Sequence, residues 1–203
     1  YHWMTGGHGG MHDRDGRDAT MPLFGMGCTN QSIEMKERQW PVTLTHFSHK
    51  TDGMGAGEFR GGCGLDSALR IDNGGGVIMS YCGDRGKFGP GGPPGLFGGQ
   101  RGIHQGVNHN PGRPNEKWLD TMFSAVPVEK DDILHHYTQG GGGYGDPLKR
   151  DPNATLEDVI DEIVSIEKAR ENYGVVIDAV DPEILDYRVN WDETEKARNE
   201  MRK

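Results

Sequence analysis

The residues best suited to chemistry lie near the start of the chain, where histidines and aspartates are mixed with glycines. The potential ligands within the first 20 residues are His2, His8, His12, Asp13, Asp15 and Asp18. Imidazole nitrogens and carboxylate oxygens bind divalent metal ions, so these side chains could form a mononuclear site. Their spacing is not diagnostic, because Gly16 comes too early for the turn of an EF-hand loop. A glycine-rich loop with solvated polar side chains is the alternative interpretation.

The backbone that must position such residues is unusually rich in glycine. Residues 140–147 read Gly-Gly-Gly-Gly-Tyr-Gly-Asp-Pro, and shorter glycine clusters occur at residues 6–10, 53–57, 60–64, 74–76 and 89–99. Glycine has no Cβ, so such segments can pack closely against other backbone or a ligand. The clusters lack the Gly-x-y period of collagen. A flexible linker is the alternative interpretation of residues 140–147. An ordered segment is favoured, because the four glycines are followed directly by Tyr144, Asp146 and Pro147.

Strand patterns dominate the first two thirds of the chain. Alternating patterns predict strands at residues 41–47, which are rich in β-branched residues, and at residues 65–71. A short apolar run predicts another strand at residues 77–82. Residues 131–137 are also strand-like. We therefore expect antiparallel sheets with a barrel-like arrangement.

Five of the 11 prolines lie between residues 83 and 114, interspersed with glycines. Proline fixes φ near the polyproline II value, and glycine lets extended segments approach one another, so this region predicts packed polyproline II segments anchored by Leu96 and Phe97. A ligand for an SH3-type domain is the alternative. The expected fold is mainly β with short C-terminal helices, and it combines the sheets with a Gly/Pro-rich bundle of polyproline II-like segments.

Helical periodicity is confined to the C-terminal part. Apolar side chains recur at helical spacing at Leu156, Val159, Ile160, Ile163 and Val164. Asn153 or Thr155 can cap this helix, and Ser165 starts a second one that Gly174 can end in the left-handed conformation.

The chain then ends in two short elements. Residues 175–177 predict a brief strand, and residues 194–203 predict a charged terminal helix. The expected organisation is a Gly-rich β and polyproline II region over residues 1–150, with a helical tail over residues 151–203 that packs on it.

Composition excludes several classes of protein. The net charge of -9 without a long basic run argues against nucleic acid as a ligand. The odd count of three cysteines (Cys28, Cys63 and Cys82) indicates reduced thiols in a cytoplasmic protein rather than a disulfide scaffold. No apolar run reaches the roughly 20 residues that span a bilayer, and no signal peptide is visible. The chain starts at Tyr1 rather than Met, as a fragment or a processed piece would.

Several motifs together carry a family resemblance. They are residues 140–148 followed by Arg150-Asp151-Pro152, residues 156–160, residues 165–177, Gly55-Ala-Gly-Glu-Phe-Arg-Gly-Gly-Cys-Gly64, Pro94-Gly-Leu-Phe-Gly-Gly99, and more loosely residues 6–10 with 15–19. In this order, and over nearly the whole chain, the set resembles the C-terminal part of subunits of the hydantoinase B/oxoprolinase family. The resemblance implies a fold in which barrel-like sheets run into a bundle of polyproline II segments.

The resemblance also implies partners. Such subunits work beside a hydantoinase A-type subunit, which binds ATP with Mg and phosphorylates a carbonyl or amide oxygen of the substrate. No phosphate-binding P-loop occurs in this chain, which is consistent with ATP being bound elsewhere. The remaining N-terminal part of the B-type subunit and a small additional subunit are further expected partners, with no membrane involved.

The family includes ketone carboxylases acting on acetone or acetophenone and ATP-dependent hydrolases of cyclic amides. Residues 21–31 and Thr45-His-Phe-Ser-His-Lys50 depart from the hydrolase pattern, so we expect a ketone carboxylase that joins bicarbonate to a small ketone. The resemblance implies a divalent metal such as Mn or Zn in the complex, with His8, His12 and Asp13 facing it. Arg60 and Arg101 are the candidates for catalytic anion contacts, and surface ion pairs are the alternative. The rival functions are a hydrolase of hydantoin, 5-oxoproline or lactam type and a non-catalytic assembly module.

Overall fold

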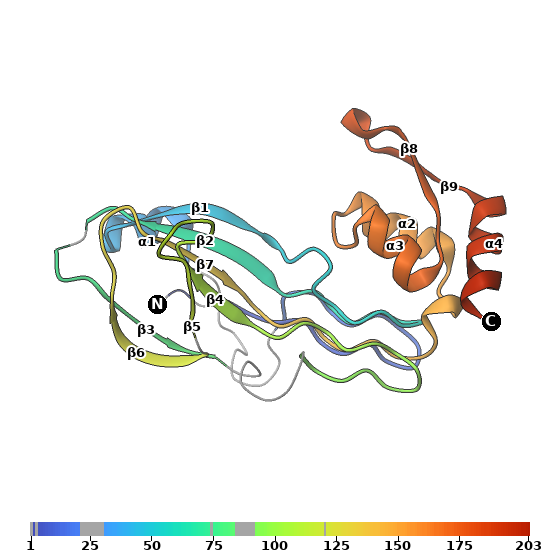
Figure 1. Ribbon diagram of the computed structural model, residues 1–203, viewed down its shortest axis with the longest axis horizontal. Helices are drawn as coiled ribbons and strands as arrows, with labels where there is room; N and C mark the ends of the chain where they lie inside the picture. The colour runs from blue at the N-terminus through green and yellow to red at the C-terminus, as the bar shows by residue number, and fades with distance from the viewer. Residues whose placement is uncertain (1, 3, 21–30, 74, 84–91, 120) are drawn as a thin grey trace.

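A computed structural model describes residues 2, 4–20, 31–73, 75–83, 92–119 and 121–203. Cys28 and residues 21–30 of the segment that departs from the hydrolase pattern lie outside the described residues. Figure 1 shows an elongated molecule with a large sheet toward one end and a group of helices at the other. None of the described helices has the length and the apolar character required to cross a membrane.

The main sheet is antiparallel and has the strand order β1-β2-β7-β4-β5. Its strands are β1 (Val42–His49), β2 (Leu65–Ile71), β7 (Ile133–Tyr137), β4 (Gly106–His109) and β5 (Lys117–Leu119). A two-stranded sheet pairs β3 (Ile78–Cys82) with β6 (Met122–Pro127), and another pairs β8 (Ile177–Asp181) with β9 (Asp186–Val189). The mainly β prediction is confirmed. Among the described strands, however, β1 and β5 are free edges of the main sheet, so the barrel is not closed.

Glycine-rich segments continue from the strands and form a bundle held by backbone hydrogen bonds (Figure 1). The bundle consists of residues 6–10, 53–64, 92–102 and 139–145. Gly141 lies at its centre, where its N–H donates to the oxygen of Gly62 and its own oxygen accepts from Gly55. A Cβ at Gly141 would overlap the carbonyl of His8, so only glycine fits there. The predicted close packing of glycine-rich segments is therefore confirmed for the described residues.

The helices gather in the C-terminal part of the chain, apart from α1 (Ile33–Gln39). They are η1 (Pro147–Lys149), α2 (Pro152–Ile160), α3 (Ile166–Tyr173), η2 (Pro182–Ile184) and α4 (Trp191–Met201). Ser165 caps α3, and Gly174 ends it in the left-handed conformation, as predicted.

The starts of two helices differ from the prediction. The cap of α2 is Asp151, whose side chain accepts a hydrogen bond from the N–H of Asn153. Pro152 fits the first helical position, because the N–H that proline lacks would have no partner within the helix there. Neither Asn153 nor Thr155 is the cap. Helix α4 begins at Trp191 rather than Thr194, because Asn190 caps it.

Two hydrophobic clusters hold these layers together. One joins Met54, Ala56 and Cys63 of the bundle to side chains of the C-terminal helices, including Val159 and Tyr173. The second consists of Ile71, Val128 and Leu134 under the main sheet. The first cluster contains side chains from both sides of residue 150, so the division into regions 1–150 and 151–203 stays a prediction.

Candidate functional site

The pairing of β2 with β7 brings titratable side chains together on one face of the main sheet. Asp66 is paired with Tyr137, and Ala68 is paired with His135. Because side chains alternate along a strand, Asp66, His135 and Tyr137 project from the same face. Lys50 follows β1 and reaches this face from the neighbouring edge.

Asp66 is the centre of this group, which we call the Asp66 cluster (Lys50, Asp66, His135 and Tyr137). The Lys50 Nζ donates to Asp66 Oδ2 at 2.9 Å, and His135 Nε2 bonds to Asp66 Oδ1. Burial alone would raise the pKa of the Asp66 carboxyl, but hydrogen bonds from His135 and Lys50 outweigh it and lower that pKa to about 2. Asp66 is therefore ionised and uses both oxygens.

This arrangement fixes the role of each imidazole nitrogen. A hydrogen bond from Nε2 to an ionised carboxylate requires the proton on Nε2, and in the neutral form of the imidazole this leaves a lone pair on Nδ1. Within the part of the chain that the structure describes, Nδ1 of His135 has no hydrogen-bond partner. The His135 side chain is 28% exposed, so solvent or a ligand can reach it. A histidine oriented by a carboxylate in this way can act as a general base.

Aromatic side chains border the Asp66 cluster. The Lys50 ammonium lies 5.2 Å from the centroid of the Tyr137 ring. Trp118 of β5 and His104 each lie edge-on to the same ring, with centroid distances of 6.1 Å. Trp118 remains 56% exposed. The cluster thus combines a base, a cation and a partly apolar rim, which suits an organic substrate that develops negative charge.

The opposite face of the same strands is closed. There His136 Nε2 shares a hydrogen bond with the Tyr81 hydroxyl, and His2 Nε2 lies 2.9 Å from the Oγ of the fully buried Ser67. Burial lowers the pKa of His136 to about 3 and that of His2 to about 4, so both imidazoles are neutral at pH 7. These groups anchor the N-terminal segment and β3 to the sheet.

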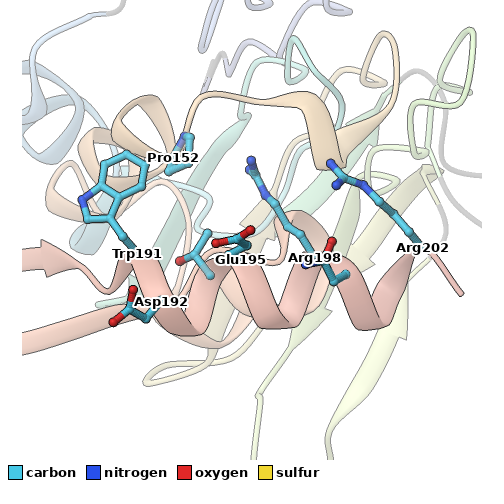
Figure 2. Close-up of a pocket in the computed structure, with 8 residues that line it drawn as sticks. Pro152, Trp191, Asp192, Glu195, Arg198 and Arg202 are labelled. Atoms are coloured by element: carbon cyan, nitrogen blue, oxygen red, sulfur yellow. The ribbon is translucent and has the colours of Figure 1, made fainter.

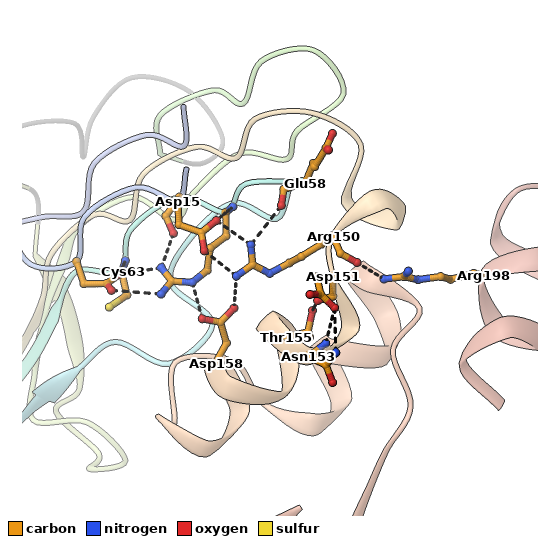
Figure 3. Close-up of polar contacts among 12 residues, drawn as sticks. Asp15, Glu58, Cys63, Arg150, Asp151, Asn153, Thr155, Asp158 and Arg198 are labelled. Atoms are coloured by element: carbon orange, nitrogen blue, oxygen red, sulfur yellow. Dashed lines mark hydrogen bonds and ion pairs between the residues drawn. The ribbon is translucent and has the colours of Figure 1, made fainter. Parts of the chain in front are cut away.

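A second charged group joins the bundle to α2 (Figure 3). Arg150 makes two bonds to Asp15, at 2.7 and 2.8 Å, and one to Asp158 at 2.7 Å. Arg60 makes the same pattern, with two bonds to Asp18 and one from Nε to Asp158 at 2.7 Å. Asp158 thus lies between two buried arginines, and we call this five-residue group the Asp158 network.

The Asp158 network explains the position of one predicted site residue. Arg60 is only 6% exposed and bonds to carboxylates of this chain, so its ion pairs are buried and are not the surface pairs of the alternative interpretation. Its catalytic role stays a prediction. Arg101 lies elsewhere, with an exposed side chain whose Nη1 donates to the oxygen of Gly92 at 3.1 Å. The structure does not bring the two arginines into one site.

The three predicted metal ligands do not form one group in the described part of the chain. His8 lies in the bundle, where its Nε2 is buried and has no hydrogen-bond partner among the described residues. His12 and Asp13 are largely exposed and 3.8 Å apart. No group of three His, Cys, Asp or Glu side chains in the described ranges is arranged to hold a metal ion. The metal role of these residues stays a prediction, and we assign no metal-dependent step to them.

A shallow groove of about 390 Å³ runs along α4 (Figure 2). Its lining residues come from α4 and from Pro152, with Trp191, Glu195, Arg198 and Arg202 along its length. Because no residue of the main sheet lines it, this groove is separate from the Asp66 cluster.

The predicted site therefore missed Lys50, Asp66 and His135. The sequence places Asp66 and His135 in predicted strands, but it does not show which strands pair or in which register. The available signal was the carboxylate of Asp66 near the start of the strand predicted at residues 65–71, because a carboxylate that becomes buried in a sheet needs a partner.

The fold defines the class of protein first. Nucleotide-free acetone carboxylase superimposes with a TM-score of 0.78 at 22% identity, over 98% of this chain and 30% of that one. ATP-dependent caprolactamase from Pseudomonas jessenii superimposes with a TM-score of 0.76 at 30% identity, over 97% of this chain and 33% of that one. This assembly of antiparallel sheets, glycine-rich bundle and short helices is thus a fold found in subunits of ATP-dependent enzymes.

Sequence comparison then gives the family. The hydantoinase B/oxoprolinase model matches residues 1–147, and the chain belongs to that family. The caprolactamase subunit beta of Pseudomonas jessenii is 35% identical over 182 residues, which are 86% of this chain and 30% of that subunit. The acetone carboxylase alpha subunit of Xanthobacter autotrophicus is 27% identical over 71% of this chain and 22% of that subunit. The chain thus spans less than a third of the length of these curated relatives.

Proposed function

We propose that this chain is part of a B-type subunit of an ATP-dependent enzyme that opens a cyclic amide. The observation that carries the proposal is the greater likeness to caprolactamase subunit beta, at 35% identity over 86% of the chain, than to acetone carboxylase alpha, at 27% over 71%. The solved caprolactamase supports it with 30% identity over the shared fold. The Asp66 cluster would supply the acid–base chemistry.

In this proposal a hydantoinase A-type partner binds ATP with Mg and phosphorylates the amide oxygen of the substrate. His135 Nδ1 then takes a proton from the water that attacks the activated carbon, and Asp66 stabilises the imidazolium that forms. A C–O bond forms, the ring C–N bond breaks, and the ring nitrogen receives the proton from His135. A second water hydrolyses the resulting acyl phosphate to the open-chain acid and phosphate.

Ketone carboxylation, which the sequence analysis favoured over hydrolysis, is the second candidate. It is supported by the match to the acetone carboxylase fold and by His46 and His49 in the segment that departs from the hydrolase pattern. In that reaction the same base would remove a proton from the carbon next to the ketone carbonyl. The divalent Mn or Zn that we expect in the complex is part of this proposal. We assign no ligand for it among the described residues.

ATP turnover by the purified complex that contains this chain tests the proposal. The complex would be supplied with caprolactam, hydantoin or 5-oxoproline, and in parallel with bicarbonate plus acetone or acetophenone. Turnover on a cyclic amide without bicarbonate is the expected result. Bicarbonate-dependent turnover on a ketone would replace it with the carboxylase function, and full turnover in a His135→Gln complex would favour the assembly module.

A further inference from the structure

Asn108 lies next to the base of the Asp66 cluster, on the same face of the main sheet. It is paired with His135 of β7 on one side and with Trp118 of β5 on the other. Residues that are paired directly across an antiparallel ladder point to the same face, with Cβ atoms about 5 Å apart. Asn108 therefore lies in a row across the sheet, between the imidazole of His135 and the indole of Trp118.

Glu116 fixes the orientation of the Asn108 amide. The Nδ2 of Asn108 donates to Glu116 Oε1 at 2.7 Å, and the N–H of Gly112 donates to Glu116 Oε2 at 2.9 Å. These hydrogen bonds, that from Asn108 first, lower the pKa of the Glu116 carboxyl, so it is ionised at neutral pH. A flipped amide would place its oxygen against a carboxylate oxygen. Nδ2 must therefore face Glu116, and Oδ1 must face away from it.

The oxygen of this amide is a buried acceptor without a donor. Asn108 is only 4% exposed, and its Oδ1 has no hydrogen-bond partner in the part of the chain that the structure describes. A buried polar atom left in this state costs about 1–3 kcal/mol. A ligand that brings a donor to Oδ1 would recover this free energy, and the position beside a general base indicates that this ligand is the substrate.

Oδ1 is covered in this structure, so a donor reaches it only after a neighbouring side chain moves. Trp118 is the neighbour in the row that can move, because it is 56% exposed. Its ring packs edge-on against Tyr137, and a Cβ at Gly106 would lie 3.3 Å from the Trp118 ring and 2.9 Å from the Tyr137 hydroxyl. Gly106 thus leaves space for both rings. An outward turn of the indole would open a partly apolar space beside Asn108 for a small ring.

We infer, on the basis of the proposed function, that Asn108 Oδ1 accepts a hydrogen bond from the ring N–H of the substrate and selects cyclic amides with a free N–H. A lactam, a hydantoin and 5-oxoproline each have such a nitrogen next to the reacting carbonyl, whereas a ketone has none. In the proposed ring opening this nitrogen takes a further proton from His135. An acceptor beside the base therefore suits the nitrogen from substrate to product.

Turnover of the full-length enzyme with caprolactam and with N-methylcaprolactam tests this role. The wild type should prefer caprolactam at least roughly 100-fold in kcat/KM, because the N-methyl compound leaves Oδ1 unpaired. Asn108→Leu should lose at least about 30-fold on caprolactam and reduce the preference to less than about 10-fold. Its Tm should not fall, because the variant removes an unpaired buried atom and Glu116 is exposed to water.

Gln105→Leu is the matched control. Gln105 is also 4% exposed, and its Nε2 has no hydrogen-bond partner among the described residues. Its Oε1 accepts from the Tyr81 hydroxyl at 3.3 Å, which places this amide on the closed face of the sheet with His136. The control should therefore keep its Tm as well, and it should also keep wild-type turnover and the wild-type preference for caprolactam.

The outcomes separate this inference from the proposed function. If the wild type turns over caprolactam and Asn108→Leu keeps both the turnover and the preference, the role of Asn108 is overturned and the enzyme proposal stands. Absence of wild-type turnover on every cyclic amide would overturn both. A lower Tm of Asn108→Leu with an unchanged preference would also overturn the inference, and it would assign Oδ1 to a donor from another segment of the same subunit.

Discussion

The same chain segments run through the main sheet and the glycine bundle. They interact through side chains in the sheet and through backbone groups in the bundle. In the sheet, β2 and β7 present Asp66 and His135, and the side chains interact. In the bundle, the continuations of these strands are bonded through backbone groups, with Gly141 between Gly55 and Gly62. The difference teaches that the central glycine positions of the bundle form a backbone scaffold without room for a Cβ, and we therefore propose that the chemistry belongs to the sheet.

The largest effect should follow the addition of one methyl group to the bundle. Gly141→Ala places a Cβ against the backbone carbonyl of His8, which cannot move without breaking neighbouring hydrogen bonds. We expect a loss of about 4 kcal/mol or more in the free energy of unfolding. Gly9→Ala is the control from the same bundle, because its Cβ would lie 3.6 Å from the oxygen of Gly142. Equal stability of the two variants in urea would contradict the scaffold role.

The next largest effect should come from the junction of the bundle with α2. Asp158→Asn removes the charge between Arg60 and Arg150, both of which are buried. Arg60 and Arg150 keep their bonds to Asp18 and Asp15, but the amide of Asn offers a donor where one guanidinium needs an acceptor. The loss of a buried charge-assisted hydrogen bond should lower the free energy of unfolding by about 3 kcal/mol. Asp186→Asn breaks an exposed pair with Arg188 and should change the free energy of unfolding far less, because solvent screens that pair. Similar losses in both variants would show that the Asp158 network contributes little.

The closed face of the sheet should make stability depend on pH. The pKa of His136 is about 3 in the folded chain and near 6.5 when unfolded, so the unfolded state binds the proton first as pH falls. Its stabilising contribution is complete above pH 6.5 and decreases between pH 6.5 and 3, by about 2 kcal/mol at pH 5. Unfolding of the wild type and of His136→Gln across this range would check it. Parallel pH profiles would contradict the neutral buried imidazole.

The smallest effect concerns thiol reactivity, which should differ between the two regions. Cys63, at the start of the bundle, is fully buried, and burial raises the pKa of its thiol to about 12. Cys82 on β3 is exposed. An alkylating reagent at pH 8 should modify Cys82 in the native chain and Cys63 only after unfolding, as peptide mapping would show. Rapid modification of native Cys63 would indicate that the bundle opens.

Local patterns predicted much of the fold. Alternation at residues 41–47 and 65–71, and the pair Ser165 and Gly174, correspond to β1, β2 and α3. These signals are local, because a strand's alternation and a helix's caps lie within a few residues. Strands β4, β5 and β9 are short and lie beside glycine or charged residues, so their patterns were too brief to recognise.

The candidate site was harder to predict, because it depends on contacts between distant residues. Asp66 and His135 are 69 positions apart and meet only through the register of β2 and β7. Arg60 was singled out as a charged residue in a glycine-rich motif. Its carboxylate partners, Asp18 and Asp158, lie 42 and 98 positions away, so the sequence could not show that they occupy its guanidinium.

Turnover of the full-length enzyme with His135→Gln tests the central claim that the sheet carries the chemistry. The variant keeps a similar size and a donor for Asp66 but lacks the basic Nδ1. We predict that kcat falls at least roughly 100-fold while Tm stays unchanged, and that His46→Gln on β1 keeps wild-type turnover. A His135→Gln enzyme with nearly full kcat would contradict the account and place catalysis outside the Asp66 cluster.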